Sequence, residues 1–315
     1  AMAENMNQLV SFGPMPVSMG CHSGPESNDL FHDMTWGIGP GGLLQICSPP
    51  ALSEVYQGQH FDPTVSALWR SHHQAFADFA FSAPAGRRVL EVGGATGYLA
   101  TLVLSGSYGV EEWTIVEPFL PEVVPPGPKF VKGWFPQAIP EATTDCLVAS
   151  HVLEHAPDPY RFILDCAEAI SDGGTLVLSW PDMKAMAART DLNMLNFEHL
   201  HFLSAETVVR MLGAAGFTVS DTEFFEGHSV FVRSVKTGAS SPVAPPAAES
   251  AEFLQQLTET YVARLRQVVS DMNDLLDSWE GETYLFGAHI FAQYLIACGL
   301  KEELCSGIVD NAAHK

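Results

Sequence analysis

The middle of the chain alternates between short apolar runs and segments in which apolar residues recur with helical spacing. Apolar runs of this length are typical of buried strands, and the helical segments stand between them. The expected strands are 88–90, 111–116, 145–150, 175–180, 217–219 and 230–232, and the expected helices are 63–81, 98–104, 158–172 and 204–213. This order predicts an α/β fold with a Rossmann-like core over residues 63–235.

The regions on either side of this core have other patterns. Residues 1–62 are rich in Gly and Pro and contain only short apolar runs, which predicts a small irregular N-terminal cap. Residues 236–250 are rich in Ala, Ser and Pro, which is typical of a linker. In residues 251–279 apolar residues recur at steps of three and four, which predicts one long helix. Its apolar stripe would form a coiled-coil seam in a homodimer or pack on its own domain.

The last part of the chain, within 251–315, has the pattern of a second nucleotide-type unit. A strand is expected at 283–286, a tight turn at 287–289, a helix from Ile290 and a second strand at 305–311. This is the beginning of a partial C-terminal βαβ unit of a second Rossmann-like fold. The sequence given stops at Lys315, so we expect either that the rest lies outside it or that these strands join another sheet.

Composition and charge indicate which kind of molecule the chain binds. Hydrophobic residues make up 47% of the 315 residues, which is typical of a globular chain with a sizeable core. The formal net charge is −22, which disfavours binding to nucleic-acid phosphates or to an anionic membrane surface. A small-molecule acceptor is therefore the expected partner. The apolar run at 284–300 is short for a membrane span and contains polar residues.

The cysteines indicate a reducing compartment. None of the six forms a Cys-x-x-Cys pair, and Cys146 and Cys166 lie within expected core elements. Free buried thiols are typical of proteins in such compartments. The first residues lack a basic region followed by an apolar run, so we expect a cytoplasmic location.

A glycine-rich turn joins the first expected strand to the next helix. The segment Glu91-Val92-Gly93-Gly94-Ala95-Thr96-Gly97 has small residues where a backbone approaches a ligand closely, and it lacks the Gly-x-Gly-x-x-Gly spacing of dinucleotide sites. A carboxylate before the turn suits a cationic ligand better than a phosphate. The pattern resembles motif I of class I S-adenosylmethionine (SAM)-dependent methyltransferases, with Ala95 in place of the middle glycine. The resemblance implies that SAM is bound by Glu91, Gly93, Ala95 and Gly97.

Two further segments resemble the same family. Glu117 and Pro118 end the second strand, and an acid about 20 residues past the turn is the usual ligand of ribose hydroxyls. Ser150-His151-Val152-Leu153-Glu154-His155, followed by Asp158-Pro159, looks like the segment after the fourth strand of many class I methyltransferases. The resemblance implies that Ser150 and His151 border the methionine end of the cofactor.

The order of parts resembles the sugar C-methyltransferases that act on nucleotide-linked keto-deoxysugars. Similar segments are 11–17, 42–45, 66–72 and 284–288. The resemblance implies a zinc-type N-terminal region, a SAM domain and a C-terminal Rossmann-like domain. The family's zinc cysteines are missing, and the remaining candidates fit no common zinc spacing: Cys21, His22, His32 and Cys47. We therefore expect no metal site.

A Glu-His pair after the fifth strand is the candidate for acceptor chemistry. Phe197-Glu198-His199-Leu200-His201 resembles the dyad of the C-methyltransferases, which implies that His199 is the base and Glu198 its neighbour. A histidine has a suitable pKa for this role near neutral pH. The family's tyrosine, three residues before this histidine, is replaced by Asn196, so O-methylation of a sugar or natural-product hydroxyl is the alternative reaction. His199 could instead be a hydrogen-bonded loop residue.

Other readings stay open. His151 and His155 are expected to line or brace the cofactor loop, and at most one of His72 and His73 is expected to face the cleft. The missing cysteines favour a non-catalytic methyltransferase-like module of a larger assembly, whereas the intact loop and Glu198-His199 favour an enzyme. A dehydrogenase would need a dinucleotide turn that this loop lacks.

Overall fold

The computed structural model describes residues 6–18, 29–56, 66–82, 88–139, 143–287 and 289–310. Its contacts divide the chain into two compact units. Unit 1 consists of Ala1–Val55, Met183–Leu203 and Pro246–Lys315, and unit 2 consists of Tyr56–Asp182 and Ser204–Pro245. Two of the unit limits fall at residues 55/56 and 245/246. The expected domain boundaries at 62/63, 235/236 and 250/251 stay a prediction. The sequence did not separate 183–203 from the core, although this segment belongs to unit 1.

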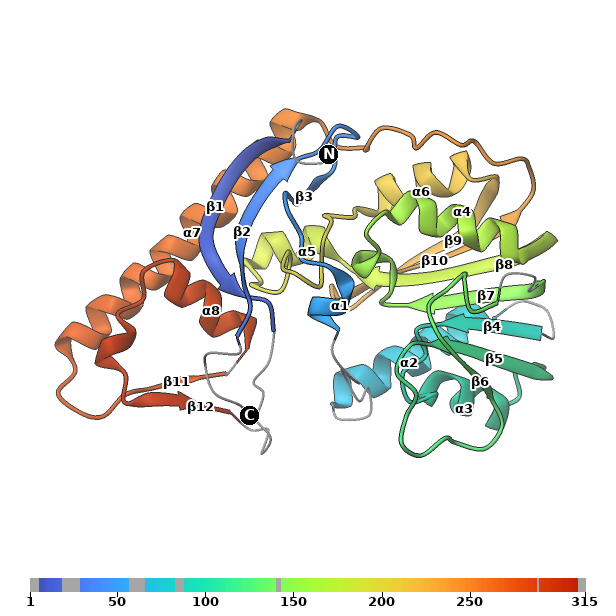
Figure 1. Cartoon of the computed structure of the whole chain (residues 1–315), viewed down its shortest axis with the longest axis horizontal. Coiled ribbons are helices and arrows are strands. Elements are labelled where there is room, and N and C mark those ends of the chain that lie inside the picture. Colours follow the sequence, from blue (N-terminus) through green and yellow to red (C-terminus); the bar gives the residue numbers. More distant parts are fainter. Residues whose placement is uncertain are drawn as a thin grey trace. The chain divides into compact units, whose positions relative to one another are not determined.

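Unit 2 is built on a seven-stranded sheet with the order β6-β5-β4-β7-β8-β10-β9 (Figure 1). Its strands are β4 (Arg88–Val92), β5 (Glu112–Glu117), β6 (Lys129–Lys132), β7 (Thr144–Ser150), β8 (Ile170–Pro181), β9 (Phe217–Phe225) and β10 (Ser229–Lys236). The first five strands in this order are parallel, and β10 runs antiparallel to both of its neighbours. The α/β, Rossmann-like fold class is thereby confirmed.

Three of the described helices of unit 2 begin at a residue whose side chain caps the first turn. They are α2 (Ala67–Ala80), α3 (Tyr98–Ser105), η3 (Leu153–His155), α4 (Pro159–Ala169) and α6 (Ala205–Ala214). Ser66, Asp158 and Ser204 each accept a hydrogen bond from a backbone N–H in the first turn of α2, α4 and α6. The apolar faces of α2 and α3 pack with the sheet around Phe76 and Phe231, so the parallel strands are held in register by one core.

Two boundaries differ from the expected ones. Helix α4 ends at Ala169, and β8 begins at Ile170, before the Gly173-Gly174 pair that we expected to end the helix. Strand β6 was not expected, because only two of its four residues are apolar. It pairs in parallel with β5 at the edge of the sheet, where a short strand with lysine at each end is common.

Unit 1 contains an antiparallel sheet where we expected an irregular cap. Strands β1 (Asn7–Pro16), β2 (Phe31–Ile38) and β3 (Leu44–Ile46) pair in that order. The expectation was wrong because β1 contains Gly13, Pro14 and Pro16, which are turn-type residues, and its pairing shifts register between Ser11 and Pro14. Cys21 and His22, two of the four zinc candidates, lie outside the described residues, and Cys47 is a buried free thiol.

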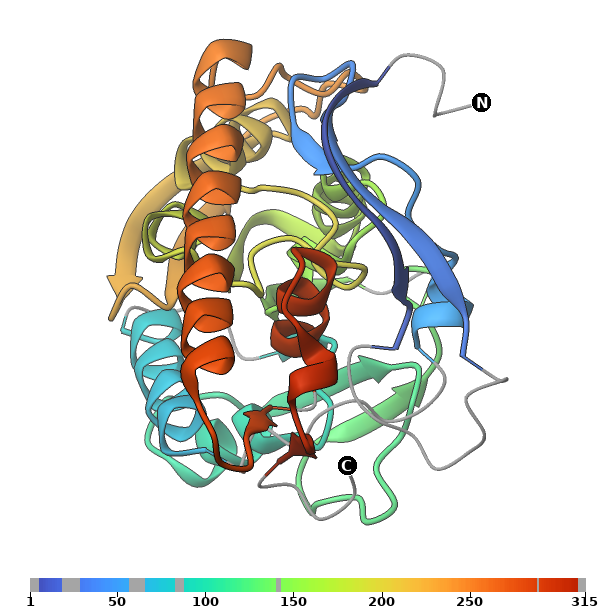
Figure 2. The same cartoon turned by 90° about the vertical axis from the view of Figure 1, so that its left-hand side faces the viewer.

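The C-terminal helices α7 (Ala251–Ser278) and α8 (Ile290–Ala297) pack against this sheet. The other described elements of unit 1 are β11 (Tyr284–Phe286), η4 (Glu302–Leu304), β12 (Gly307–Val309), α1 (Leu52–Val55) and α5 (Met183–Arg189). Figure 2 shows α7 and α8 as the orange and red helices. The rings of Phe12 and Tyr294 are 4.9 Å apart, and those of Trp36 and Tyr261 are 5.3 Å apart. Strands β11 and β12 pair in parallel, as the expected βαβ unit requires.

The apolar stripe of α7 is divided between the core and the surface. The buried positions are Leu254, Thr258, Tyr261, Val262, Leu265 and Val269. Farther along, Leu275 and Trp279 are exposed. The first part of the stripe therefore packs on its own unit, and a dimer seam stays a prediction for the rest. Among the described helices, none combines the length and the apolar character that a bilayer crossing needs.

Candidate cofactor site

The glycine-rich turn lies between β4 and α3 and has the backbone shape that its sequence requires. Gly93, Ala95 and Gly97 have φ angles of 72°, 45° and 77°. The Gly93 N–H donates to the Val116 carbonyl at 3.0 Å, which ties the turn to β5. Gly97 is packed so closely that a Cβ there would lie 2.9 Å from the Phe130 ring. Ala95 adopts a left-handed conformation that costs a residue with a side chain about 1–2 kcal/mol, so its surroundings must hold it there.

Glu117 at the end of β5 binds this turn with one carboxylate oxygen and the backbone that follows β5 with the other. Oε2 accepts from the Ala95 N–H at 3.0 Å, and Oε1 accepts from the Phe119 N–H at 3.1 Å. Burial raises the pKa of Glu117, and the two backbone donors act in the opposite direction. The structure thus places the expected ribose ligand beside the expected SAM turn, with Pro118 next to it in the chain.

Glu91 lies beneath the turn. It is buried on β4, and its Oε2 accepts from Trp113 Nε1 at 2.8 Å. A Cβ on Gly94 would lie 2.8 Å from the Glu91 carboxyl carbon, so the carboxyl supports the turn from below. Burial is the largest cause that raises the pKa of Glu91 to about 8; Glu117 raises it further, and the Trp113 bond lowers it.

This pKa makes stability depend on pH in a defined direction. The folded pKa of about 8 lies above the ordinary value of 4.5, so folded Glu91 keeps a proton that the unfolded chain loses in between. The free energy of unfolding should therefore fall as pH rises from 5 to 8 by about 3–4 kcal/mol more in the unaltered protein than in Glu91→Gln. Urea unfolding of both proteins at the two pH values measures this difference. Exposed Glu112→Gln is the control, and equal pH dependence of Glu91→Gln and the unaltered protein would contradict the prediction.

The expected cofactor residues meet at one edge of the sheet. Glu91, the turn and Glu117 follow or end β4 and β5, and Ser150 and His151 end or follow β7. Because these three neighbouring strands are parallel, their carboxyl ends lie together. The hydroxyls of Thr96 and Ser150 are buried there without a hydrogen-bond partner among the described residues. Thr96 was missed as a candidate, because a hydroxyl within a glycine-rich turn gives no sequence signal of its own.

The candidate base, His199, lies in unit 1 on a segment without regular structure. Its Nδ1 is 2.7 Å from the Asn193 carbonyl, so Nδ1 carries the hydrogen and Nε2 carries the lone pair of the neutral ring. Asn196 is fully buried, and its Oδ1 accepts from the N–H groups of Glu198 and His199 at 2.8 and 2.9 Å. Where the resemblance has a tyrosine, this chain therefore has an amide that shapes the backbone before His199.

Two tyrosines from the C-terminal helices fix the segment that leads to His199. Tyr261 on α7 donates its hydroxyl to the Asp191 carbonyl at 2.8 Å, and Tyr294 on α8 donates to the Leu195 carbonyl at 2.5 Å. Both rings are buried. The helices that the sequence placed after the linker thus support the candidate base within the same unit.

We expect Tyr261→Phe to lower the free energy of unfolding by about 1 kcal/mol, because a buried carbonyl loses its donor while the ring still fills its place. Denaturant unfolding measures the change. Tyr284→Phe is the control, since the Tyr284 ring is half exposed. An unaltered midpoint for Tyr261→Phe would show that the Asp191 carbonyl gains nothing from this bond.

The remaining candidate histidines lie in different surroundings. His155 Nδ1 is 2.9 Å from the Tyr56 hydroxyl in unit 2, and the backbone of His201 forms a bridge with Gln45 in unit 1. His72 and His73 are both buried on α2, and the expectation that at most one of them faces the cleft stays a prediction. His73 Nδ1 lies 2.8 Å from the Trp69 carbonyl, one turn earlier in the same helix.

Comparison with known proteins agrees with the sheet and the turn. A family profile described as "Methyltransferase domain" matches residues 61–222. A probable S-adenosylmethionine-dependent methyltransferase of Mycolicibacterium smegmatis is 29% identical over 170 residues, which are 49% of this chain and 61% of that protein. An uncharacterized methyltransferase of Mycobacterium tuberculosis is 32% identical over 124 residues, which are 37% of this chain and 45% of that protein. The matches thus cover about half the length of these relatives.

Solved structures with a similar fold have little sequence in common with the chain. The N-methyltransferase NodS from Bradyrhizobium japonicum, in complex with S-adenosylhomocysteine, is 17% identical with a TM-score of 0.41, covering 55% of this chain and 89% of that one. An S-adenosylmethionine-dependent methyltransferase from Mesorhizobium loti is 16% identical with a TM-score of 0.42, covering 55% of this chain and all of that one.

Proposed function

Because the chain belongs to the methyltransferase domain family, we propose that it binds SAM at the carboxyl edge of the unit 2 sheet and transfers the methyl group to a small-molecule acceptor. The observation that carries the proposal is the bond from the Ala95 N–H to the Glu117 carboxylate, which joins the glycine-rich turn to the acid at the end of β5. The two buried hydroxyls of Thr96 and Ser150 support a polar ligand at this edge.

The acceptor that we propose is a nucleotide-linked keto-deoxysugar, methylated at carbon. SAM supplies an electrophilic methyl group and a neutral thioether leaving group. His199 Nε2 takes the proton from the carbon next to the ketone, and the resulting enolate carbon forms the new C–C bond as the S–CH₃ bond breaks. The carbonyl of Asn193 supports this role, because it fixes the tautomer in which Nε2 is the basic atom. Glu198 stands beside the base in the chain.

O-methylation of a sugar or natural-product hydroxyl is the second candidate, and Asn196 is the observation that favours it. Its side-chain oxygen accepts two backbone N–H bonds, and its Nδ2 lies 3.0 Å from Asn193 Oδ1. Nδ2 also donates to the Asn193 carbonyl at 3.3 Å, so both N–H groups of the amide bind Asn193 and neither is left to donate a hydrogen bond to an enolate oxygen. A hydroxyl acceptor needs only a base, so His199 would suffice.

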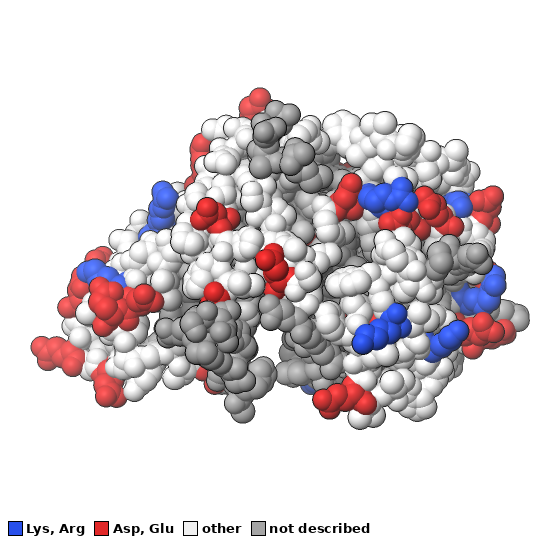
Figure 3. Space-filling model, in the orientation of Figure 1, with Lys and Arg blue, Asp and Glu red and all other residues white. Residues whose placement is uncertain are grey.

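The charge of the surface supports a small acceptor over a nucleic acid. The formal net charge is −22, and the few Lys and Arg side chains on the described part of the face in Figure 3 stand mostly beside acids. Arg161 pairs with Asp165 and Glu168, and Arg88 pairs with Asp145. Paired cations of this kind offer little to a phosphate backbone. A homodimer and a cytoplasmic location stay part of the proposal.

Calorimetric titration with SAM, S-adenosylhomocysteine and NAD tests the cofactor. Micromolar binding of the two sulfur ligands and none of NAD is the expected result. An acceptor screen with methyl-labelled SAM then follows, starting with nucleotide-linked keto sugars and the corresponding hydroxyl compounds, with the label located by mass spectrometry. Absence of binding by either sulfur ligand would contradict the proposal. Binding without transfer to any acceptor would favour the non-catalytic module.

A further inference from the structure

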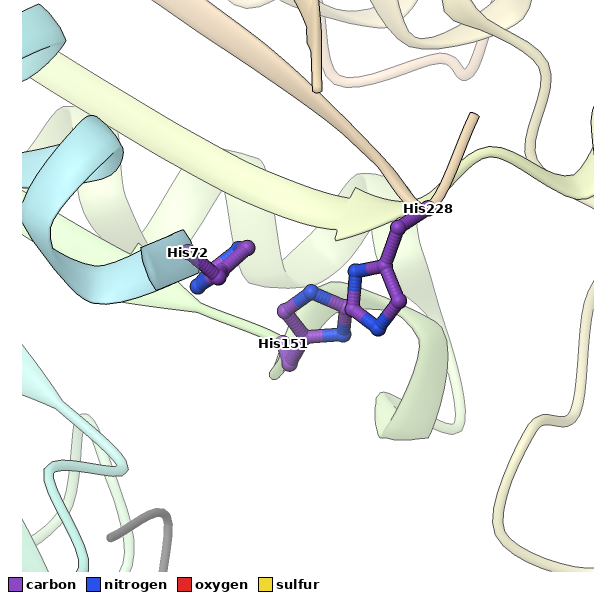
Figure 4. Close-up of side chains that lie close together, drawn as sticks. All are labelled: His72, His151 and His228. Carbon is purple, nitrogen blue, oxygen red and sulfur yellow. The ribbon is translucent and has the colours of Figure 1, made fainter. Parts of the chain in front are cut away.

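Three imidazole rings from separate parts of unit 2 converge on one point (Figure 4). His72 lies on α2, His151 follows β7, and His228 lies in the turn between β9 and β10. The ring centroids are 5.0 Å apart for His72 and His151, 5.6 Å for His151 and His228, and 5.7 Å for His72 and His228. One nitrogen of each ring lies within 4.8 Å of the other two, so the rings can offer three donors to one ion.

We propose that His72, His151 and His228, here called the three-histidine cluster, bind a divalent transition-metal ion such as Zn²⁺ or Co²⁺. Imidazole nitrogen is a preferred ligand of these ions, and three histidines leave one tetrahedral position for a water or an acceptor oxygen. Zinc–nitrogen bonds of about 2.0–2.1 Å put tetrahedral ligand atoms about 3.4 Å apart. The rings therefore need to approach one another by little more than about 1 Å.

The His72 ring is fully buried, where a charged imidazolium would lose its hydration. A neutral imidazole has a lone pair that it can donate to a metal ion.

Outer groups orient the rings as in known metal sites. His151 Nδ1 is 3.0 Å from Oε1 of the buried Glu154, which is the carboxylate–histidine pairing that fixes metal ligands. The Ser179 hydroxyl lies 3.0 Å from His72 Nε2. The Ser229 hydroxyl lies 2.9 Å from His151 Nε2 and 2.6 Å from His228 Nδ1. These hydroxyls hold the rings close together. Rotation of each serine about its Cα–Cβ bond would move its hydroxyl away from a ring nitrogen that binds the ion.

Two features of the cluster have no explanation in simple packing. His72 Nδ1 is buried without a hydrogen-bond partner among the described residues, which is costly for a polar atom. His151 has a φ of 54°, a left-handed conformation that is uncommon outside glycine and is often found at functional sites.

Trp69 covers the three rings of the cluster. Its ring centroid lies 4.7, 5.0 and 5.1 Å from those of His151, His228 and His72.

Titration of the chelator-treated protein with Co²⁺ and Zn²⁺ tests the proposal without any activity measurement. We expect uptake of one equivalent, with the visible absorption of tetrahedral Co²⁺ that Zn²⁺ displaces. His151→Asn and His228→Asn should each weaken binding by about 100-fold or more; asparagine tolerates the left-handed backbone of His151. His73→Gln is the matched control, because His73 lies on the same helix as His72 but outside the cluster.

The position of Trp69 gives a second readout. Bound Co²⁺ should quench its fluorescence, and Trp69→Phe should keep Co²⁺ uptake but lose this quenching. Failure to take up one equivalent would overturn the proposal, as would full affinity in both asparagine variants or full quenching in Trp69→Phe. Circular dichroism confirms that each variant is folded. The metal site does not depend on the methyltransferase proposal, so either can fail alone.

Discussion

Replacing His199 with alanine is expected to lower turnover by about 100-fold or more while the affinity for SAM stays within a few-fold. The side chain takes the acceptor's proton in the proposed reaction, and it lies in unit 1, whereas the SAM turn belongs to unit 2. Its loss should therefore affect kcat and leave cofactor binding nearly unchanged. Steady-state kinetics and calorimetry on the same preparation separate the two effects.

His201→Gln is the matched control for this variant. His201 is also buried and lies two residues farther along the same segment, but no proton transfer is assigned to it. A similar loss of turnover in both variants would point to damage of the segment rather than removal of a base. Unaltered turnover in His199→Ala would remove His199 from the mechanism and make it a loop residue that binds the Asn193 carbonyl.

The parts of the fold that could be predicted are those with a clear pattern of apolar residues along the sequence. Strands β4, β5 and β7 and helices α3 and α7 were predictable because each is a contiguous apolar or periodic run. Glycine follows β4 and begins α3, and Ser250 caps α7. Strand β1 was not, because its pairing with β2 joins residues as distant as Asn7 and Ile38 and tolerates Gly13 and two prolines through a shift of register. No local pattern encodes such a pairing.

The same distinction holds for the sites. The SAM turn could be proposed because its residues are consecutive, and Glu117 because its distance from the turn follows from one strand–helix–strand unit. The three-histidine cluster could not, since α2, β7 and the β9–β10 turn bring its members together only in the folded sheet. The sequence showed Asn196 only as the replacement of a tyrosine. The structure shows that it is a buried amide that binds the backbone N–H groups of Glu198 and His199.

Replacing Glu117 with alanine is expected to weaken SAM binding by about 30–150-fold, which corresponds to about 2–3 kcal/mol. The proposed role in binding ribose hydroxyls accounts for part of this loss. The rest follows from the structure, because the carboxylate also holds the N–H groups of Ala95 and Phe119. Without the carboxylate, the strained Ala95 is no longer bound to the end of β5. SAM must then order the turn when it binds, and this lowers the binding free energy.

Glu117→Gln separates these two contributions. The glutamine oxygen can still accept one backbone hydrogen bond, so the turn keeps part of its support while the charge is lost, and the affinity should fall between those of the unaltered protein and Glu117→Ala. Calorimetry with SAM and S-adenosylhomocysteine measures all three proteins, with exposed Glu112→Gln on the same strand as the control. Equal affinity in Glu117→Ala would mean that the ribose is bound elsewhere and that the turn keeps its shape without the carboxylate.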